Sequence, residues 1–351
     1  MAGQSSMSTT QIDLLRMLLD EAAEPKALPL PLLTEITNGF SDEMEIGRGG
    51  FAVVYKGVLK DRAVALKRLL KTYMHQEEFL REVECLVKVR HKNIVRFLGY
   101  CVESQGNVQS YNGNIVIAED LQKILCFEYL PKGTLYDYIT DASGGLDWRT
   151  RYKIIKGVCE GMQYLHETNI VHLDLKPANV LLDETLIPKI TDFGLSRRFK
   201  DDQTRWENTK VGGTFGYLAP EFNDGTITYK FDLYSLGVII TEIITGKRGY
   251  QDVDDVVASW SNRCDRLEWN QIRVCTEIGL ECSDFNPGKR PKSVKHIVDR
   301  LAKTESSSQV VAAEGVASND LLSVRPSVLR FPFKNWGHIR CPLHLTNTTD
   351  E

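Results

Sequence analysis

The spacing of apolar and polar residues divides the chain into parts of different character. Up to about Cys126, apolar residues come in short β-branched runs, such as residues 53–55 and 63–66, which is typical of strands. From about Thr134 to Ala302 they recur at helical spacing. The pattern predicts an α+β protein with strands concentrated in its first part and helices in its second.

Several shorter segments depart from this pattern. Residues 11–24 predict an amphipathic helix, and docking on the protein's own core is favoured over binding a partner. Residues 28–31 alternate leucine with proline, so we expect an extended linker, because proline denies a helix its hydrogen bonds. Residues 103–123 are polar and predict a surface loop between two strands, with a partner site as the less favoured alternative. Residues 304–318 have a linker's composition.

Composition and charge exclude several classes of protein. The 351 residues are 42% hydrophobic and 26% charged, and the net charge of −4 argues against nucleic acid as a ligand. The sequence has no apolar run of roughly 18–20 residues and no secretory signal, so we expect no transmembrane segment. Its eight scattered cysteines form no C-x-x-C pair, which predicts a reduced, cytoplasmic protein. Recruitment to a membrane by a partner stays open.

Residues 47–54, Gly-Arg-Gly-Gly-Phe-Ala-Val-Val, form a glycine-rich segment. Glycines two positions apart let backbone N–H groups approach a phosphate without an intervening Cβ. A β-branched run follows, so the segment predicts a hairpin over a nucleotide, whereas a dinucleotide-binding turn would lead into a helix. Taken alone, an ordinary turn explains it equally well.

Lys67 ends an apolar strand, and Glu82 lies in the helix that follows. Phe79, Val83 and Leu86 mark the buried stripe of that helix, and their spacing places Glu82 on the same face. A buried carboxylate is costly unless it is paired. Each residue alone would be ordinary surface, but together they predict a Lys67–Glu82 ion pair.

Residues 170–182 and 191–194 bring together groups suited to phosphate chemistry. Asp174 precedes Asn179 by five positions and Asp192 by 18. Carboxylate and amide oxygens are ligands that Mg²⁺ prefers, and Asp174 can accept a hydroxyl proton. Asp192 opens an Asp-Phe-Gly tripeptide that alone would be a turn. The occurrence of both motifs in this order, followed by Ala-Pro-Glu at 219–221, argues strongly against an ordinary turn.

With these motifs in this order, the chain resembles the eukaryotic protein kinases. It is most similar to the receptor-like and receptor-like cytoplasmic serine/threonine kinases of plants, as residues 34–40, 90–95 and 98–101 indicate. The resemblance covers about residues 40–301. It implies a bilobal fold with an N-terminal extension at 1–39 and a kinase domain at 40–303, divided into an N-lobe at 40–127, a hinge at 128–130 and a C-lobe at 131–303.

The resemblance implies a role for each matching residue. Lys67 would hold the α- and β-phosphates of ATP and pair with Glu82, Asp174 would be the catalytic base, and Lys176 would steady the transferring phosphate. Mg²⁺ or Mn²⁺ would be held by Asn179 and Asp192. The nucleotide would be enclosed by Gly47, Arg48, Gly49, Gly50, Phe51, Ala52, Val54, Ala65, Lys67, Phe127, Glu128, Leu130 and Leu181.

The resemblance also implies supporting contacts and partners. Asp232 would brace the catalytic loop, and Glu221 would pair with Arg290. Lys176, with Thr214 ahead of residues 219–221, indicates serine/threonine specificity. The implied partners are ATP, a protein substrate with a serine or threonine hydroxyl, and an upstream receptor complex.

The sequence departs from the family pattern at a few positions. Leu173 stands where many kinases carry an arginine that pairs with a phosphorylated residue, so we predict that Thr204 and Thr209 are not obligatory switches. Ala52 replaces the third glycine of the loop, and residues 246–270 form a shorter segment than expected. The basic cluster at 197–200 could bind a phosphate, although a solvated face explains it better.

Residues 319–351 resemble the opening strands of a major-sperm-protein-like β-sandwich, with alternation from Ile339 to Leu345. Such a sandwich needs on the order of 100 residues, so only a partial one is expected. Two alternatives to an active kinase remain: a pseudokinase scaffold that transfers no phosphate, and an adaptor acting through this C-terminal segment.

Overall fold

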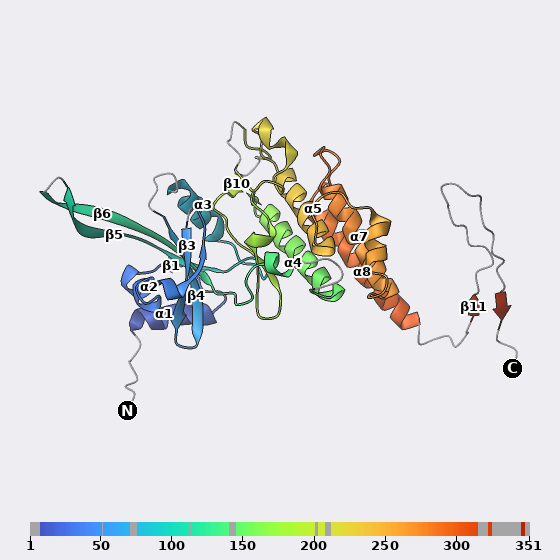
Figure 1. Cartoon of the computed structure of the whole chain (residues 1–351), viewed down its shortest axis with the longest axis horizontal. Coiled ribbons are helices and arrows are strands. Elements are labelled where there is room, and N and C mark those ends of the chain that lie inside the picture. Colours follow the sequence, from blue (N-terminus) through green and yellow to red (C-terminus); the bar gives the residue numbers. More distant parts are fainter. Residues whose placement is uncertain are drawn as a thin grey trace, which may run out of the picture. The chain divides into compact units, whose positions relative to one another are not determined.

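The computed structural model describes residues 8–50, 52–70, 76–111, 114–139, 145–200, 203–207, 212–314, 322–324 and 345–347. The chain divides into two compact units, Met1–Ala302 and Lys303–Glu351. The first unit contains a β-rich part followed by a helical part (Figure 1). This arrangement confirms the predicted order of strands and helices and fits the two lobes of the expected fold.

A six-stranded sheet forms the core of the β-rich part, with the strand order β1-β5-β6-β4-β3-β2. β3 and β4 pair along their whole length, as their β-branched and alternating residues favour. The strands are β1 (Lys26–Ala27), β2 (Glu45–Arg48), β3 (Ala52–Leu59), β4 (Arg62–Leu69), β5 (Phe97–Tyr111) and β6 (Asn114–Glu128).

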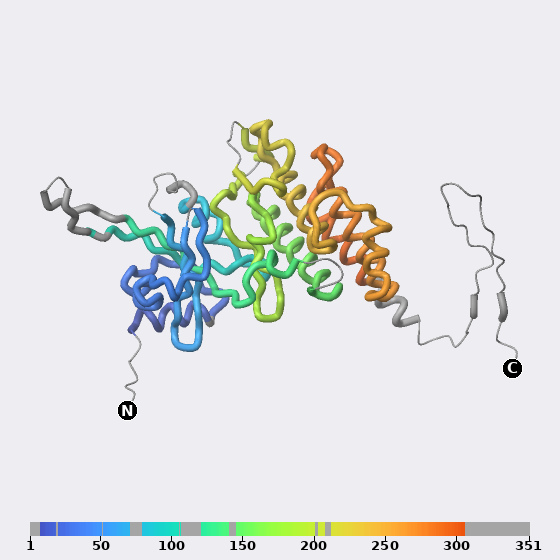
Figure 2. Tube along the Cα trace, viewed as in Figure 1, coloured from blue at the N-terminus to red at the C-terminus, as the bar shows by residue number. Residues whose placement is uncertain are grey.

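The two faces of this sheet are covered by different helices. Successive side chains of a strand point to opposite faces, so Leu125 and Phe127 of β6 pack in the cluster that includes Phe79 of helix α3 (Gln76–Leu86). Ile124 and Cys126 pack on the other side, with helices α1 (Thr9–Leu19) and α2 (Leu30–Ile36). Figure 2 shows this N-terminal segment, in dark blue, lying against the strands.

Two predictions for the segments that precede the sheet need correction or refinement. The predicted helix at 11–24 runs from Thr9 to Leu19 and is docked on the protein's own core, as expected. The predicted linker at 28–31 is correct only in its first half: Pro29 is extended after β1 ends at Ala27, but α2 begins at Leu30, with Pro31 in its first turn. Proline is tolerated there because that amide has no partner within the helix.

The predicted loop at 103–123 is wrong, because β5 and β6 continue through it as a long antiparallel hairpin (Figure 1). The pairing runs without interruption from Cys101 opposite Ile124 to Tyr111 opposite Asn114. The polar composition hid this, although Asn-Gly at 112–113 is a sequence typical of a two-residue hairpin turn.

The second part of this unit is built from helices around a buried central one. α5 (Lys230–Thr245) is buried along nearly its whole length and packs against α7 (Arg266–Cys282). The other helices are α4 (Trp148–Glu167), α6 (Val253–Ser259) and α8 (Val294–Glu314), with 3-10 turns at Asp42–Met44, Leu135–Tyr138, Pro177–Asn179 and Pro220–Asp224. Short strands lie between them: β7 (Ile170–Val171), β8 (Val180–Leu182), β9 (Pro188–Ile190) and β10 (Arg197–Arg198).

The C-terminal segment is described only in part. α8 continues to Glu314, so most of the predicted linker at 304–318 is helical. In the second unit, β11 (Leu322–Val324) pairs with β12 (Leu345–Asn347) in antiparallel fashion. Most of the segment likened to a β-sandwich, including residues 339–344, lies outside the described residues, so that expectation stays a prediction.

None of the helices in the described part of the chain has both the length and the apolar character needed to cross a membrane.

Candidate active site

Lys67 lies at the centre of a partly buried charge cluster, in which Glu82 is buried and the Asp192 side chain is 43% exposed. Its Nζ is 2.8 Å from Oε2 of Glu82 and 2.7 Å from Oδ1 of Asp192. Strand β4 supplies the lysine, helix α3 the glutamate, and the loop after β9 the aspartate. The structure therefore forms the predicted ion pair and adds Asp192 as a second partner, which the sequence pattern did not indicate.

Burial and charge act against each other in this cluster. Burial disfavours the charged form of Lys67, but the carboxylates of Glu82 and Asp192 outweigh it and raise the pKa of the lysine. The Lys67 ammonium holds the pKa of Asp192 below its ordinary value. Burial raises the pKa of Glu82, whose side chain is only 2% exposed, and Lys67 opposes part of that rise. At neutral pH Lys67 therefore carries a firmly held positive charge.

Asp174, Lys176 and Thr214 form a second polar cluster, and Asn179 supports it. Nζ of Lys176 donates to Oδ2 of Asp174 at 2.8 Å and to Oγ1 of Thr214 at 2.7 Å. The Thr214 hydroxyl donates to the other Asp174 oxygen at 2.7 Å. Asn179 donates its amide hydrogens to the backbone oxygen and the carboxylate of Asp174, at 2.8 and 3.0 Å. A hydroxyl group can thus lie against this carboxylate with its oxygen beside a cation.

Asp232 holds the backbone of the loop that leads from β7 to Asp174. Its carboxylate accepts hydrogen bonds from the amides of His172 and Leu173, at 2.8 and 2.9 Å, and its Oδ2 is 2.9 Å from Nε2 of His166. Burial alone would raise the pKa of Asp232, but the bonds from His166 and Leu173 lower it. The expected brace is present, and His166 is a member that the sequence did not reveal.

The brace also fixes an unusual backbone conformation. Leu173 has φ of 70°, a region that residues with a β-carbon rarely adopt, and Asp192 has φ of 67°. Nε2 of His172 lies 3.0 Å from the backbone oxygen of Thr191, which ties the loop to the segment that carries Asp192. Such conformations cost about 1–3 kcal/mol each and persist only where surrounding contacts enforce them.

A cavity of about 350 Å³ lies between the charge clusters and the glycine-rich loop. Among the predicted residues, it is lined by Gly49, Gly50, Ala52, Val54, Lys67, Glu82, Asp174, Lys176 and Asp192. Residues of the Lys67 cluster, of the Asp174 cluster and of the glycine-rich loop therefore face the same cavity. Its open volume suits a small polyanionic ligand.

Among the described residues, the other predicted nucleotide residues are not part of the lining of this cavity. Gly47 and Arg48 pair with Val54 and Val53 in the hairpin, and Arg48 also bonds to Glu45. Ala65 is opposite Phe127 in the sheet. Glu128, Leu130 and Leu181 lie in or beside the described connection between the two parts, where Leu130 is buried. Phe51 lies outside the described residues.

The chemistry of Asn179 and Asp192 fits a magnesium ion. The Asn179 amide nitrogen is engaged with Asp174, which leaves its carbonyl oxygen as an acceptor, and Asp192 shares only one oxygen with Lys67. Within the described part of the chain, no group of three or more His, Cys, Asp or Glu residues is placed to hold a metal. Mg²⁺ ordinarily takes one or two protein oxygens and completes its shell with phosphates and water.

Leu173 belongs to an apolar cluster rather than to a charged one. It is 5% exposed and packs with Phe199, Ala219, Ile227 and Phe231. This apolar cluster joins the loop that carries Leu173 to Phe199, just after β10, and to Phe231 in α5. This packing agrees with the expectation that a phosphate on Thr204 or Thr209 is not needed to order the loop; Thr209 lies outside the described residues.

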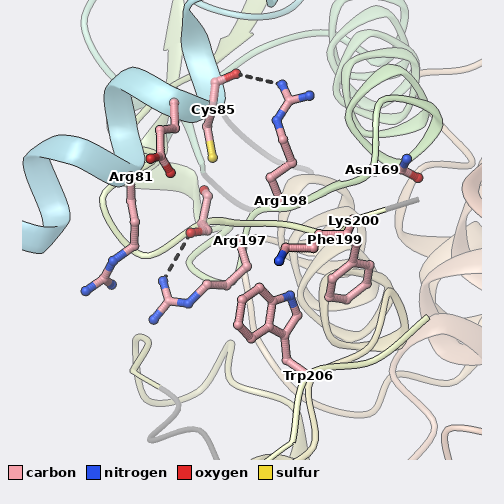
Figure 3. Close-up of a pocket in the computed structure, with 10 residues that line it drawn as sticks. Arg81, Cys85, Asn169, Arg197, Arg198, Phe199, Lys200 and Trp206 are labelled. Atoms are coloured by element: carbon pink, nitrogen blue, oxygen red, sulfur yellow. Dashed lines mark hydrogen bonds between the residues drawn. The ribbon is translucent and has the colours of Figure 1, made fainter. Parts of the chain in front are cut away.

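The basic residues at 197–200 lie on a separate cavity of about 670 Å³, shown in Figure 3. Arg81 of α3 also lines it, together with Cys85, whose backbone oxygen accepts a 3.4 Å hydrogen bond from Arg198. Arg197 donates to the backbone oxygens of Leu195 and Ser196, and Arg198 to that of Cys85. These bonds indicate a structural role for the two guanidinium groups.

Glu221 and Arg290 form the predicted pair. Two hydrogen bonds, of 2.6 and 2.7 Å, join the two side chains in bidentate geometry, and the Arg290 side chain is fully buried. Arg290 also donates to the backbone oxygens of Asp284 and Lys230, both at 2.8 Å. The pair thereby fastens the Ala-Pro-Glu segment to the start of α5 and the end of the α7 region.

A two-part fold with a lysine–carboxylate pair, a loop held by a buried aspartate and a polar cavity of about 350 Å³ is typical of the protein kinase class. A family model described as the protein kinase domain matches residues 40–319. The chain belongs to this family.

The curated relatives are plant receptor-like kinases. Cysteine-rich receptor-like protein kinase 6 of Oryza sativa subsp. japonica is 38% identical over 75% of this chain and 40% of its own length. G-type lectin S-receptor-like serine/threonine-protein kinase SD1-13 of Arabidopsis thaliana is 37% identical over 80% of this chain and 35% of its own length. Cysteine-rich receptor-like protein kinase 28 of Arabidopsis thaliana is 37% identical over 78% and 42%. The chain thus spans about two fifths of these relatives' length.

Proposed function

We propose that the chain is an ATP-dependent protein serine/threonine kinase, which transfers the γ-phosphate of Mg·ATP to protein hydroxyls. The observation that carries this proposal is the Thr214 hydroxyl, held 2.7 Å from both the Asp174 carboxylate and the Lys176 ammonium. A substrate hydroxyl placed in the same way would have its proton directed at a base and its oxygen beside a cation. The names of the relatives that include serine/threonine-protein kinase support the same substrate class.

The roles of the catalytic residues follow from their positions. Asp174 orients the substrate hydroxyl and accepts its proton as the oxygen bonds to the γ-phosphorus. The bond between that phosphorus and the oxygen bridging to the β-phosphate breaks, and ADP leaves with the electron pair. Lys176 neutralises charge on the transferring group, and Lys67, fixed by Glu82, binds the remaining phosphates. Mg²⁺ held by Asn179 and Asp192 would supply further positive charge to the phosphates.

The nucleotide site is proposed at the 350 Å³ cavity and the connection beside it. The loop at 47–54, including Phe51, would cover the phosphates. Val54, Ala65 and Leu181 would enclose the adenine, with Phe127 as gatekeeper before the hinge residues Glu128 and Leu130. Phe127 is 5% exposed and packs on Phe97 at a ring distance of 5.5 Å, which supports a closed rear wall.

A scaffold without phosphate transfer is the alternative, but the complete set of charged residues favours catalysis. The test is transfer from labelled ATP with Mg²⁺ to the protein and to a basic acceptor protein, comparing the wild type with Asp174→Asn and Lys67→Met. We expect transfer by the wild type and a loss of at least about 10²-fold in each variant. Binding of Mg·ATP by a wild type that transfers no phosphate would refute catalysis and establish the scaffold.

The cellular setting is part of the same proposal. Because its relatives are named receptor-like kinases, we place the chain in receptor-linked signalling, in the cytoplasm and at membranes to which a partner recruits it. Residues 319–351 would form a partial major-sperm-protein-like segment. Deleting that segment should leave phosphate transfer unchanged; loss of partner binding with catalysis intact would assign it an adaptor role.

A further inference from the structure

Helix α1 precedes the residues matched by the kinase family model, yet it is packed into the N-lobe. Leu14 is fully buried and Met17 is 5% exposed. Both lie in one cluster with Leu66, Leu98 and Cys126 of the sheet. The family match begins only at residue 40, so α1 is an addition to the domain that has become part of its core.

The side chain of Arg96 forms hydrogen bonds to backbone oxygens at the C-terminal end of this helix. One guanidinium nitrogen of Arg96, Nη2, donates to the backbone oxygens of Met17 and Asp20, and Nη1 donates to that of Leu18 at 3.3 Å. The last carbonyl groups of a helix have no partners within it and carry partial negative charge. A half-buried cation at this position bonds to several of these backbone oxygens together, so the position of Arg96 is tied to the end of α1.

The backbone of the same arginine is bonded to the hinge. Its amide donates to Oε1 of Glu128 at 2.8 Å, and the Glu128 amide donates to the Arg96 oxygen at 3.0 Å. Lys189 also donates to Oε1 of Glu128 at 2.8 Å. Glu21, Arg96, Glu128 and Lys189 line a second cavity, also of about 350 Å³, which is distinct from the one beside the glycine-rich loop. Leu130 is buried, so packing holds that end of the hinge, and hydrogen bonds hold Glu128 on the side of this second cavity.

We infer that Arg96 is a positioning residue through which the docked helix α1 sets the hinge and thereby strengthens nucleotide binding. The inference rests on the proposed nucleotide site, because it takes residues 128–130 as the hinge. Releasing the guanidinium removes one of the contacts that hold Arg96, whose backbone forms two of the hydrogen bonds to Glu128. The phosphate-handling residues Lys67, Asp174 and Lys176 belong to other elements, so the chemical step is spared.

The experiment uses the full chain and Arg96→Ala, with Arg90→Ala as a matched control. Arg90 lines the same cavity and donates to the backbone oxygen of Ala23 at 2.9 Å, but its own amide bonds to the Tyr164 hydroxyl rather than to the hinge. The measurements are KM for ATP, kcat, Mg·ADP affinity by calorimetry, and Tm. We expect Arg96→Ala to raise KM and the ADP dissociation constant about five- to tenfold with kcat within about twofold. Arg90→Ala should lower Tm alone.

Two further variants separate positioning from general loosening. Arg96→Lys keeps the charge and part of the bonding, so it should recover part of the lost affinity even if Arg96→Ala folds poorly. Leu14→Ala loosens α1 without touching Arg96; it should weaken ADP binding, and the double variant Leu14→Ala, Arg96→Ala should be no weaker than Arg96→Ala.

Equal nucleotide affinity in Arg96→Ala and the wild type would overturn the inference, and so would an equal loss in Arg90→Ala. Fully additive losses in the double variant would also overturn it, since the helix would then act by another route. Failure of the wild type to bind Mg·ADP would refute the proposed nucleotide site itself, and the inference with it.

Discussion

Glu221→Gln is the substitution whose effect on stability the structure defines most sharply. The Arg290 side chain is fully buried, and Glu221 is its only charged partner among the contacts described for it. The variant keeps the size of the side chain but leaves a buried guanidinium without a counter-charge. Breaking a buried pair in this way costs about 3–5 kcal/mol. Arg290 keeps the carbonyl oxygens of Asp284 and Lys230, which places the expected loss near the lower end of that range.

The assay is thermal and urea denaturation of the purified chain. For a domain of this size, a loss of about 3 kcal/mol lowers Tm by about 6–12 °C. The Arg273–Asp254 pair is the matched control: its N···O distance is also short, at 2.8 Å, but Asp254 is 81% exposed. Asp254→Asn should therefore cost less than about 1 kcal/mol.

A second variant tests the reason for the loss. Glu221→Gln combined with Arg290→Met removes both charges, so it should be less destabilised than Glu221→Gln alone. A Tm change in Glu221→Gln no larger than that of Asp254→Asn would refute the reasoning. It would mean that water or movement of the chain relieves the buried charge.

Three other predictions follow from contacts described above. The double variant Thr204→Ala, Thr209→Ala should retain phosphate transfer, because Leu173 orders its loop by apolar packing; complete loss of transfer with the fold intact would contradict this. Because the pKa of Asp232 is lowered in the folded protein, its contribution to stability is present above its unfolded pKa of about 3.9 and is lost as pH falls below it. Asp232→Asn should therefore flatten the fall in unfolding free energy between about pH 5 and 3, and an unchanged slope would exclude Asp232 as its source. Gly99→Ala would place a Cβ inside van der Waals contact of the Lys26 carbonyl oxygen, so it should separate β1 from β5 and lower stability by about 1–3 kcal/mol; an unchanged Tm would show that β1 moves freely.

The sequence predicts the charged centre well because its residues lie at fixed spacings within regular elements. The helical period that places Glu82 beside Phe79 and Leu86 was sufficient to predict the pair with Lys67. The second bond from Lys67 to Asp192 could not be predicted in this way, because it depends on how a loop 125 positions later folds back.

The prediction of a loop at residues 103–123 was wrong because it relied on composition, whereas backbone pairing decides the structure there. Residues 103–123 are polar, yet they continue two strands, because interstrand hydrogen bonds do not depend on which side chains are apolar. The docking of α1 was predicted, but its attachment through Arg96 was not. Every residue has a backbone carbonyl group, so the sequence does not indicate which arginine binds three of them.

The apolar packing of Leu173 has a consequence for how such an enzyme can be controlled. Contacts among Leu173, Phe199 and Phe231 depend on excluded water and hardly respond to ionic strength. Treatment with a phosphatase removes nothing from them. A loop held in this way takes its order from folding alone, so under the proposed function the rate of phosphate transfer would follow the amount of folded chain and the supply of substrate.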